Sequence, residues 1–235
     1  MTRWFALLVV VAGCDRVLGL DDVNAPGKGG DAGSNTGPDA PLACTPRLDT
    51  LHDDFSGAIA CAPWGASYTH GGATIAQANH AVTITGNAGG TSYAGCDSST
   101  GTPLEAEGIF VEVSQHFTGM YGYTVFSLDL TQSSVVQLDI DAGGTIQLEN
   151  HDGSTTYGTP ATYDEVAMRF LRIRPNVEKT ALVGEVSPDA IRWTAIADTG
   201  TGVAVPATVG ITLIAGNDDN GDGSTGQFSH LNVCP

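Results

Sequence analysis

The clearest candidate for metal chemistry is a short acidic run near the C-terminus. Asp218, Asn220 and Asp222 alternate with other residues and precede Gly223, which matches the first half of an EF-hand calcium loop. Oxygen ligands at alternate positions can converge on one hard cation, and the glycine permits the sharp turn. The twelfth position of the loop is Ser229 instead of a bidentate glutamate, and Asn/Asp/Gly clusters also form ordinary hairpin turns. Calcium is therefore the one cofactor that the sequence suggests, and a plain turn is the alternative.

Carboxylates arranged for catalysis are not evident. Glycoside hydrolysis needs two carboxyl groups facing one sugar, and the nearest pair, Glu105 and Glu107, is expected in a solvated loop. The Gly-x-Ser-x-Gly motif of serine hydrolases does not occur, and the six histidines are scattered along the chain. We therefore expect that the protein is not an enzyme.

Aromatic side chains offer a second kind of site. Tyr121, Tyr123, Tyr157 and Tyr163 lie in or beside expected strands, where they could stack on sugar rings. Tyrosine is equally common as a core residue whose hydroxyl edge is exposed to solvent. Trp64 and Trp193 are expected in the core.

The N-terminus predicts export. Arg3 is followed by nine apolar residues, 4–12, which are too few to span a bilayer but fit a signal peptide. Val11-Ala12-Gly13-Cys14 comes next and resembles the lipobox of bacterial lipoproteins. The resemblance implies removal of residues 1–13, lipidation of Cys14 and membrane anchoring in the cell envelope. Whether the anchor is in the outer membrane at the cell surface or on the periplasmic face of the inner membrane is left open.

A flexible tether is expected between the lipidated cysteine and the folded domain, over residues 14–41. From residue 21 to 41 the chain is rich in Gly, Pro, Asp and Asn, and Val23 is its only aliphatic residue larger than alanine. Such a segment cannot bury enough apolar surface to offset its ordering entropy. The folded domain is therefore predicted to span residues 42–235.

The charge of the chain excludes one class of partner. The formal net charge is −17, with only nine lysines and arginines. Nucleic-acid binding requires clustered basic residues, so we expect no nucleic-acid partner. The remaining basic group, which contains Arg172 and Arg174, is expected on one outward strand face, either at a sheet edge or paired with local acids.

Four cysteines remain once lipid has consumed Cys14, and an even number in an exported domain suggests two disulfides. Three pairings are possible. We favour Cys61–Cys96 and Cys44–Cys234, since the second pair would join the two ends of the domain. Metal binding by cysteine is disfavoured because no CxxC spacing occurs.

Alternation of apolar and polar residues predicts an all-β domain. Glycine-containing turns separate the runs. This pattern is typical of a two-sheet antiparallel sandwich or jelly roll. The predicted strands cover residues 82–84, 109–114, 121–130, 136–141, 146–148, 171–174, 209–214 and 231–233. In the strand 136–141, alternation places Gln137, Asp139 and Asp141 on the outward face.

Several segments resemble concanavalin A-like, laminin G-like jelly rolls. The opening Leu51-His52-Asp53-Asp54-Phe55 with the downstream Trp64 resembles the first strand of that family. Residues 170–174, 186–190 and Trp193 resemble its "LRI … S-x-D-G-x-x-W" hairpin, with Ala190 where the family prefers glycine. Residues 209–211 and 228–233 resemble its closing strands. The resemblance implies the fold, but it does not imply a ligand.

Taken together, these patterns predict a cell-envelope lipoprotein that presents a non-catalytic jelly-roll binding module, whose partner is a glycan or a surface protein. One alternative is a structural or interaction domain without a small-molecule site. Another is a divergent glycan hydrolase. A sheet face that carries exposed aromatics beside acidic residues would separate the first hypothesis from the second.

Overall fold

The structure is a computed structural model that describes residue 44 and residues 51–62, 64–98, 101–131, 133–150, 155–218 and 221–235. The compact domain runs from Leu42 to Pro235. The predicted signal peptide, Cys14 and the tether lie outside the described residues. Within the described ranges, no helix is long and apolar enough to cross a membrane. The only helical element there is a 3-10 turn, Gly200–Gly202.

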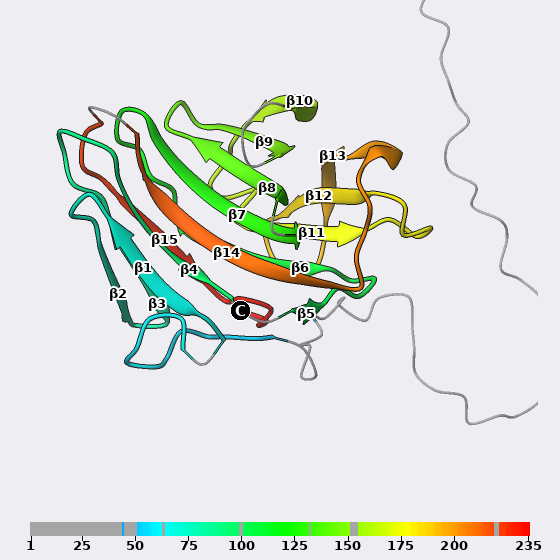
Figure 1. Cartoon of the computed structure of the whole chain (residues 1–235), viewed down its shortest axis with the longest axis horizontal. Helices are drawn as coiled ribbons and strands as arrows, with labels where there is room; N and C mark the ends of the chain where they lie inside the picture. Colours follow the sequence, from blue (N-terminus) through cyan, green and yellow to red (C-terminus); the bar gives the residue numbers. More distant parts are fainter. Residues whose placement is uncertain are drawn as a thin grey trace, which may run out of the picture. The chain divides into compact units, whose positions relative to one another are not determined.

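The larger of two antiparallel sheets contains eight strands, and β5 (Thr102–Pro103) pairs with β14 off the main path. β7 and β14 are the longest strands, with ten residues each, and both bend along their length (Figure 1). The main path runs β1 (Ala66–His70), β4 (Ser92–Asp97), β14 (Thr208–Asn217), β7 (Gly122–Thr131), β8 (Ser134–Asp141), β9 (Thr145–Asn150) and β10 (Thr156–Thr162).

The smaller sheet contains seven strands and packs against the first (Figure 1). Its order is β13 (Thr194–Asp198), β12 (Leu182–Ser187), β11 (Phe170–Pro175), β6 (Ile109–Gln115), β15 (Thr225–Ser229), β3 (Ala81–Thr85) and β2 (Thr74–Ala78). The predicted all-β class and two-sheet antiparallel jelly-roll architecture are confirmed.

Alternation along the strands builds the core between the sheets. On β7, Phe126 and Leu128 are fully buried against the other sheet, while Tyr123 and Asp129 on the opposite face are half-buried. On β14, Ile211 and Leu213 point into the same core. Every second side chain of these strands therefore points to the outer face of the larger sheet.

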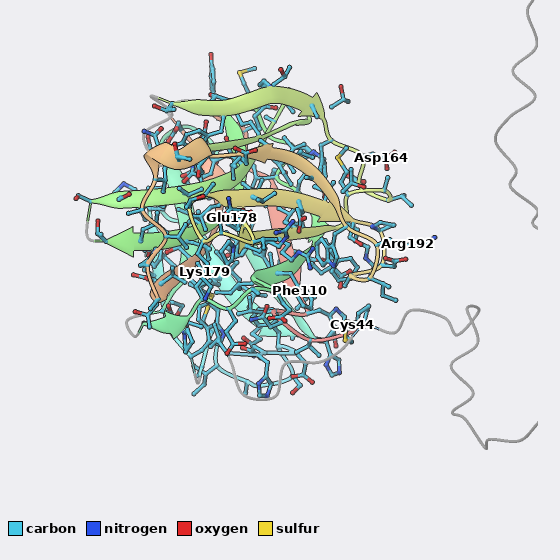
Figure 2. The ribbon with its side chains drawn as sticks, turned by 90° about the vertical axis from the view of Figure 1, so that its right-hand side faces the viewer. Cys44, Phe110, Asp164, Glu178, Lys179 and Arg192 are labelled. Carbon is cyan, nitrogen blue, oxygen red and sulfur yellow. A yellow bond between two sulfur atoms is a disulfide. The ribbon has the colours of Figure 1, made fainter. Side chains whose placement is uncertain are left out.

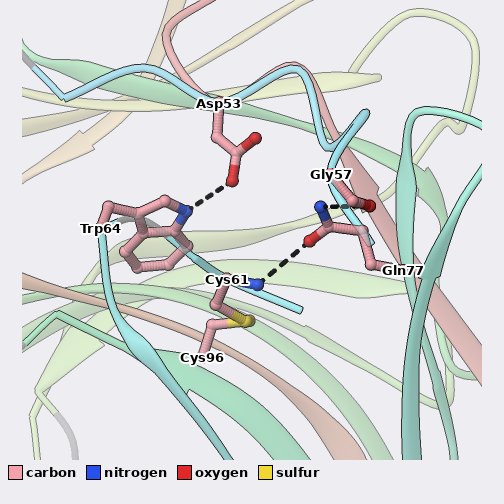
Figure 3. Close-up of a disulfide and its surroundings, with 6 residues drawn as sticks. All are labelled: Asp53, Gly57, Cys61, Trp64, Gln77 and Cys96. Atoms are coloured by element: carbon pink, nitrogen blue, oxygen red, sulfur yellow. Dashed lines mark hydrogen bonds between the residues drawn. A yellow bond between two sulfur atoms is a disulfide. The ribbon is translucent and has the colours of Figure 1, made fainter. Parts of the chain in front are cut away.

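Two disulfides and a buried hydrogen bond hold the ends of the domain. The structure pairs Cys44 with Cys234 and Cys61 with Cys96, the pairings that we favoured. Next to the second disulfide, the indole of Trp64 donates to Asp53 Oδ2 at 2.8 Å (Figure 3). Burial of Asp53 raises the pKa of that carboxyl. A bridge that closes a loop of this length contributes about 3–4 kcal/mol in the chain-entropy model.

The predicted strand at residues 231–233 is wrong. The last strand, β15, ends at Ser229, and Leu231 pairs only through an isolated bridge with Asp53. His230 and Asn232 have φ values of 49° and 52°, and this left-handed conformation interrupts a strand. Leu231 and Asn232 are buried, but this segment does not form a continuous run of strand hydrogen bonds.

Trp193, which is predicted to lie in the core, is only partly buried and packs against a second, smaller core cluster. It packs with Phe110 and Phe170 in a separate cluster on the outer face of the smaller sheet, to which Cys44 also packs (Figure 2). The guanidinium of Arg172 lies 4.0 Å above the Trp193 ring. The nearby Ala190 has a φ of 56°, a left-handed conformation that favours glycine.

Candidate functional site

The outer face of the larger sheet is hollowed into a groove of about 1030 Å³. A second hollow of about 550 Å³ adjoins it, and Tyr68, Val125, Gln137 and Ile214 line both. We call the two together the tyrosine groove. Its aromatic and acidic lining consists of Tyr68, Tyr93, Tyr121, Tyr123, Asp97, Asp129, Asp139, Asp141, Glu149 and Asp218.

Strand register explains why these side chains meet. Tyr93 pairs with Gly216 across β4 and β14, and Gly216 pairs with Tyr123 across β14 and β7. Tyr123 in turn pairs with Asp141 on β8. Because directly opposed residues share a face, two tyrosines and a carboxylate form one row across the sheet.

The neighbouring row contains one tyrosine and one carboxylate. Tyr68 on β1 pairs with Gly95 on β4, and Val125 on β7 pairs with Asp139 on β8. Ile214 on β14 joins these pairs, since it lies opposite both Gly95 and Val125. Tyrosine therefore approaches the carboxylates from the β1 side of the groove in both rows.

Two glycines make room for the aromatic rings. A Cβ at Gly95 would lie 2.7 Å from the hydroxyl oxygen of Tyr68, and one at Gly216 would lie 2.4 Å from the Cβ of Tyr93. Without side chains at these positions, the tyrosines can occupy the floor of the groove. The rings of Tyr68 and Tyr93 lie edge to face, with their centroids 6.4 Å apart. The ring of His70 stacks on that of Tyr93, with a centroid distance of 4.8 Å.

Tyr121 projects from a strained turn at the rim of the groove. Its side chain is 60% exposed, and its φ is 57°. The carbonyl of Tyr121 accepts the backbone N–H of Asp218 at 3.1 Å, which ties the two lining residues together. A non-glycine residue in this conformation costs on the order of 1 kcal/mol, and such strain concentrates at ligand sites.

The acidic side of the groove combines a fixed carboxylate with a carboxyl that lacks a donor. Glu149 on β9 accepts hydrogen bonds from the side-chain amides of Gln137 at 2.9 Å and Gln147 at 2.6 Å. Asp139 is half-buried, and its Oδ1 atom has no hydrogen-bond partner among the described residues. Asp139 also lines the groove, so an unpartnered carboxyl and the fixed carboxylate of Glu149 share one surface.

Burial is the main cause that raises the pKa of Asp139 to about 7. The charges of Glu149, Asp141 and Asp218 raise the pKa further. Near neutral pH the groove therefore contains a carboxyl group that is only partly ionised, among carboxylates that repel its charge. Perturbed carboxyls in a cleft are typical of functional sites.

The sequence identified part of this site. Of the four tyrosines that it proposed for stacking, Tyr121 and Tyr123 line the groove, whereas Tyr157 is half-buried against the core and Tyr163 is buried. Tyr68 and Tyr93 were missed because their strands, β1 and β4, lack an apolar period. The alternation had placed Gln137, Asp139 and Asp141 on one outward face, and that face is the floor of the groove.

The predicted calcium ligands that the structure describes and the acidic pair Glu105 and Glu107 do not come together in one site. Asp218 lines the groove, Asp222 is exposed and Asn220 lies outside the described residues. In the part of the chain that the structure describes, no three His, Cys, Asp or Glu side chains are grouped to hold a metal. Glu105 and Glu107 lie in the loop between β5 and β6, and neither lines the groove.

Comparisons with known proteins bear on the fold. No protein-family profile and no curated sequence matches the chain. A glycosyl hydrolase family protein from Mycobacterium fortuitum is similar in structure, with a TM-score of 0.50 and 10% identity over 77% of this chain and 97% of that one.

Two further solved structures are similar at lower scores. A legume lectin-like domain from Entamoeba histolytica has a TM-score of 0.45 and 14% identity, covering 70% of this chain and 87% of that one. The carbohydrate recognition domain of Emp47p has a TM-score of 0.42 and 16% identity, covering 77% and 94%. At these identities the similarity extends to the fold alone.

Proposed function

We propose that the tyrosine groove binds a glycan chain and that the domain is a non-catalytic binding module of a lipid-anchored cell-envelope protein. One observation supports this most: four of the six tyrosines of the chain line a single groove together with carboxylates and amides. An alternative without a small-molecule site predicts no such cleft. The groove therefore counts against a purely structural domain.

The chemistry of the lining matches what a sugar presents. A pyranose ring has an apolar face, which packs on an aromatic ring, and hydroxyl groups around its edge that need hydrogen-bond partners. The exposed ring of Tyr121 offers a stacking surface at the rim. Asp139 and Glu149 offer carboxylate oxygens that can accept hydroxyl protons. The two adjoining hollows provide room for more than one sugar unit.

Replacing Tyr121 or Tyr123 with alanine is expected to weaken glycan binding about tenfold, or about 1.4 kcal/mol, because a stacking surface is lost. The measurement is calorimetric titration of the full chain in detergent with hexasaccharides of glucose, N-acetylglucosamine, glucosamine and galacturonate, after a polysaccharide array, with and without calcium. Val177→Ala is the matched control, since Val177 is 90% exposed on the loop between β11 and β12. Absence of binding to every glycan would refute the proposal.

The proposed membrane localisation rests on the N-terminal sequence. Lipidation of Cys14 would anchor the chain to a membrane, since each buried methylene of an acyl chain contributes about 0.8 kcal/mol. A Cys14→Ser chain is expected to move from the detergent phase to the aqueous phase when the two are separated, whereas the wild type stays with the detergent. Identical partitioning of the two proteins would contradict the anchor.

A second candidate function is glycan hydrolysis, and the protonated state of Asp139 favours it. Asp139 and Asp141 are two residues apart on one face of β8 and both line the groove, so it contains the two carboxyl groups that glycoside hydrolysis needs. Release of reducing ends from the polysaccharide array, lost in Asp139→Asn, would establish this function. No release would leave the groove as a binding site only.

A further inference from the structure

The ionisable lining of the tyrosine groove is acidic throughout. Apart from tyrosine, the ionisable side chains that line it are Asp97, Asp129, Asp139, Asp141, Glu149 and Asp218. Among the described residues that line the two hollows there is no lysine, arginine or histidine. A cleft lined by one sign of charge concentrates the field of that sign, so the groove attracts cations and repels anions.

The tyrosine rings add to this preference. The face of an aromatic ring carries partial negative charge and attracts an ammonium group that lies over it. Tyr123 lies directly opposite Asp141, and Asp139 lies beside that pair on β8. A cation between a ring and a carboxylate would satisfy both partners in one place.

Asp139 provides the most specific contact. Asp139 lines the groove, and its Oδ1 atom has no hydrogen-bond donor among the described residues. Burial, together with the charges of Glu149, Asp141 and Asp218, makes its ionisation unfavourable. An ammonium group bound beside this carboxyl would compensate the crowded negative charge. A hydroxyl group would not compensate the charge, and a carboxylate on the ligand would add to the repulsion.

Resting on the proposed glycan-binding function, we propose that the tyrosine groove selects glycans that carry free amino groups. Polymers of unacetylated amino sugars, such as glucosamine, are the substrate class that fits this lining. Neutral glycans of the same length would retain the stacking and hydroxyl contacts but lose the ammonium contact. Uronate polymers would be excluded.

The experiment is a titration of the full chain in detergent, at neutral pH and low salt, with hexamers of glucosamine, N-acetylglucosamine and galacturonate. The glucosamine hexamer is expected to bind at least tenfold more tightly than its N-acetylated counterpart, and the galacturonate hexamer not at all. Raising the salt from about 0.05 M to about 0.5 M should reduce the preference, since ionic screening weakens exposed charge contacts.

Variants identify the residue responsible. Asp139→Asn is expected to reduce the preference for glucosamine over N-acetylglucosamine to threefold or less, while Glu178→Gln, on the loop between β11 and β12, should leave it unchanged. Equal affinity for the two hexamers, or tighter binding of galacturonate, would overturn the amine selectivity but leave the groove a glycan site. Failure of every hexamer and every polysaccharide to bind would overturn the proposed function itself.

Discussion

Asp139→Asn is expected to stabilise the domain above neutral pH, by about 2–4 kcal/mol in the free energy of unfolding at pH 8. The pKa of Asp139 is raised from 3.8 to about 7 in the folded state, mainly by burial. Each unit of pKa difference corresponds to about 1.4 kcal/mol, which sets an upper bound near 4 kcal/mol.

The sign follows from proton binding. Between about pH 4 and pH 7 the folded state holds a proton that the unfolded state has lost, so wild-type stability falls as the pH rises through this window. Asparagine cannot ionise and escapes this loss. The difference between variant and wild type should therefore be small below pH 4, grow up to pH 7 and stay constant above it.

Urea unfolding followed by circular dichroism at several pH values measures this difference. Glu178→Gln is the matched control, because Glu178 is exposed on a loop remote in sequence from β8 (Figure 2), and its effect should stay within about 0.5 kcal/mol at every pH. A pH-independent effect, or destabilisation at pH 8, would show that ionisation of Asp139 does not destabilise the folded state. A stabilising Asp139→Asn would indicate that the groove retains an acid at the expense of stability.

Glu185→Ala is expected to destabilise the domain by about 3–5 kcal/mol, because it removes the carboxylate that accepts hydrogen bonds from two partly buried guanidinium groups. Glu185 on β12 is 4% exposed. It accepts hydrogen bonds from Arg172 Nε at 2.6 Å and from Arg174 Nε at 3.0 Å. Desolvation lowers the pKa of Arg172, which stays charged, and Glu185 offsets this cost more than the second nearby acid, Glu107.

The measurement is the same urea unfolding, made at pH 7. Glu185→Gln retains an acceptor and most of the volume, and should cost less than the alanine variant. A loss below about 1 kcal/mol for Glu185→Ala would mean that solvent already screens these charges. Glycan binding by the folded fraction should not change, since this network lies on the smaller sheet, opposite the tyrosine groove.

Much of the fold could be predicted because its central strands alternate clearly. Val136, Leu138 and Ile140 point one way and their neighbours the other, as β8 requires. β4, with the sequence Ser-Tyr-Ala-Gly-Cys-Asp, carries almost no apolar period. It is buried because β1 and β14 pair with it on both sides, and such pairing is a tertiary property that local sequence does not contain.

The site was less predictable than the fold for the same reason. Tyr93 and Tyr123 become neighbours only because β14, near the end of the chain, inserts between β4 and β7. Outward positions on β8 were identified correctly as polar, but alternation cannot tell a solvated face from the floor of a groove. The arginines show the same limit: Arg172 and Arg174 share an outward face and pair with an acid, but β11 lies inside its sheet instead of at an edge.

The most direct test of glycan binding in the groove uses the six tyrosines as reporters. Tyrosine can be labelled selectively with carbon-13 in its ring, and the ring signals followed by nuclear magnetic resonance as the tightest-binding hexasaccharide is added. We predict that the signals of Tyr68, Tyr93, Tyr121 and Tyr123 shift together, while those of Tyr157 and Tyr163, which do not line the groove, stay in place. Unchanged signals for the four groove tyrosines under saturating sugar would contradict the account.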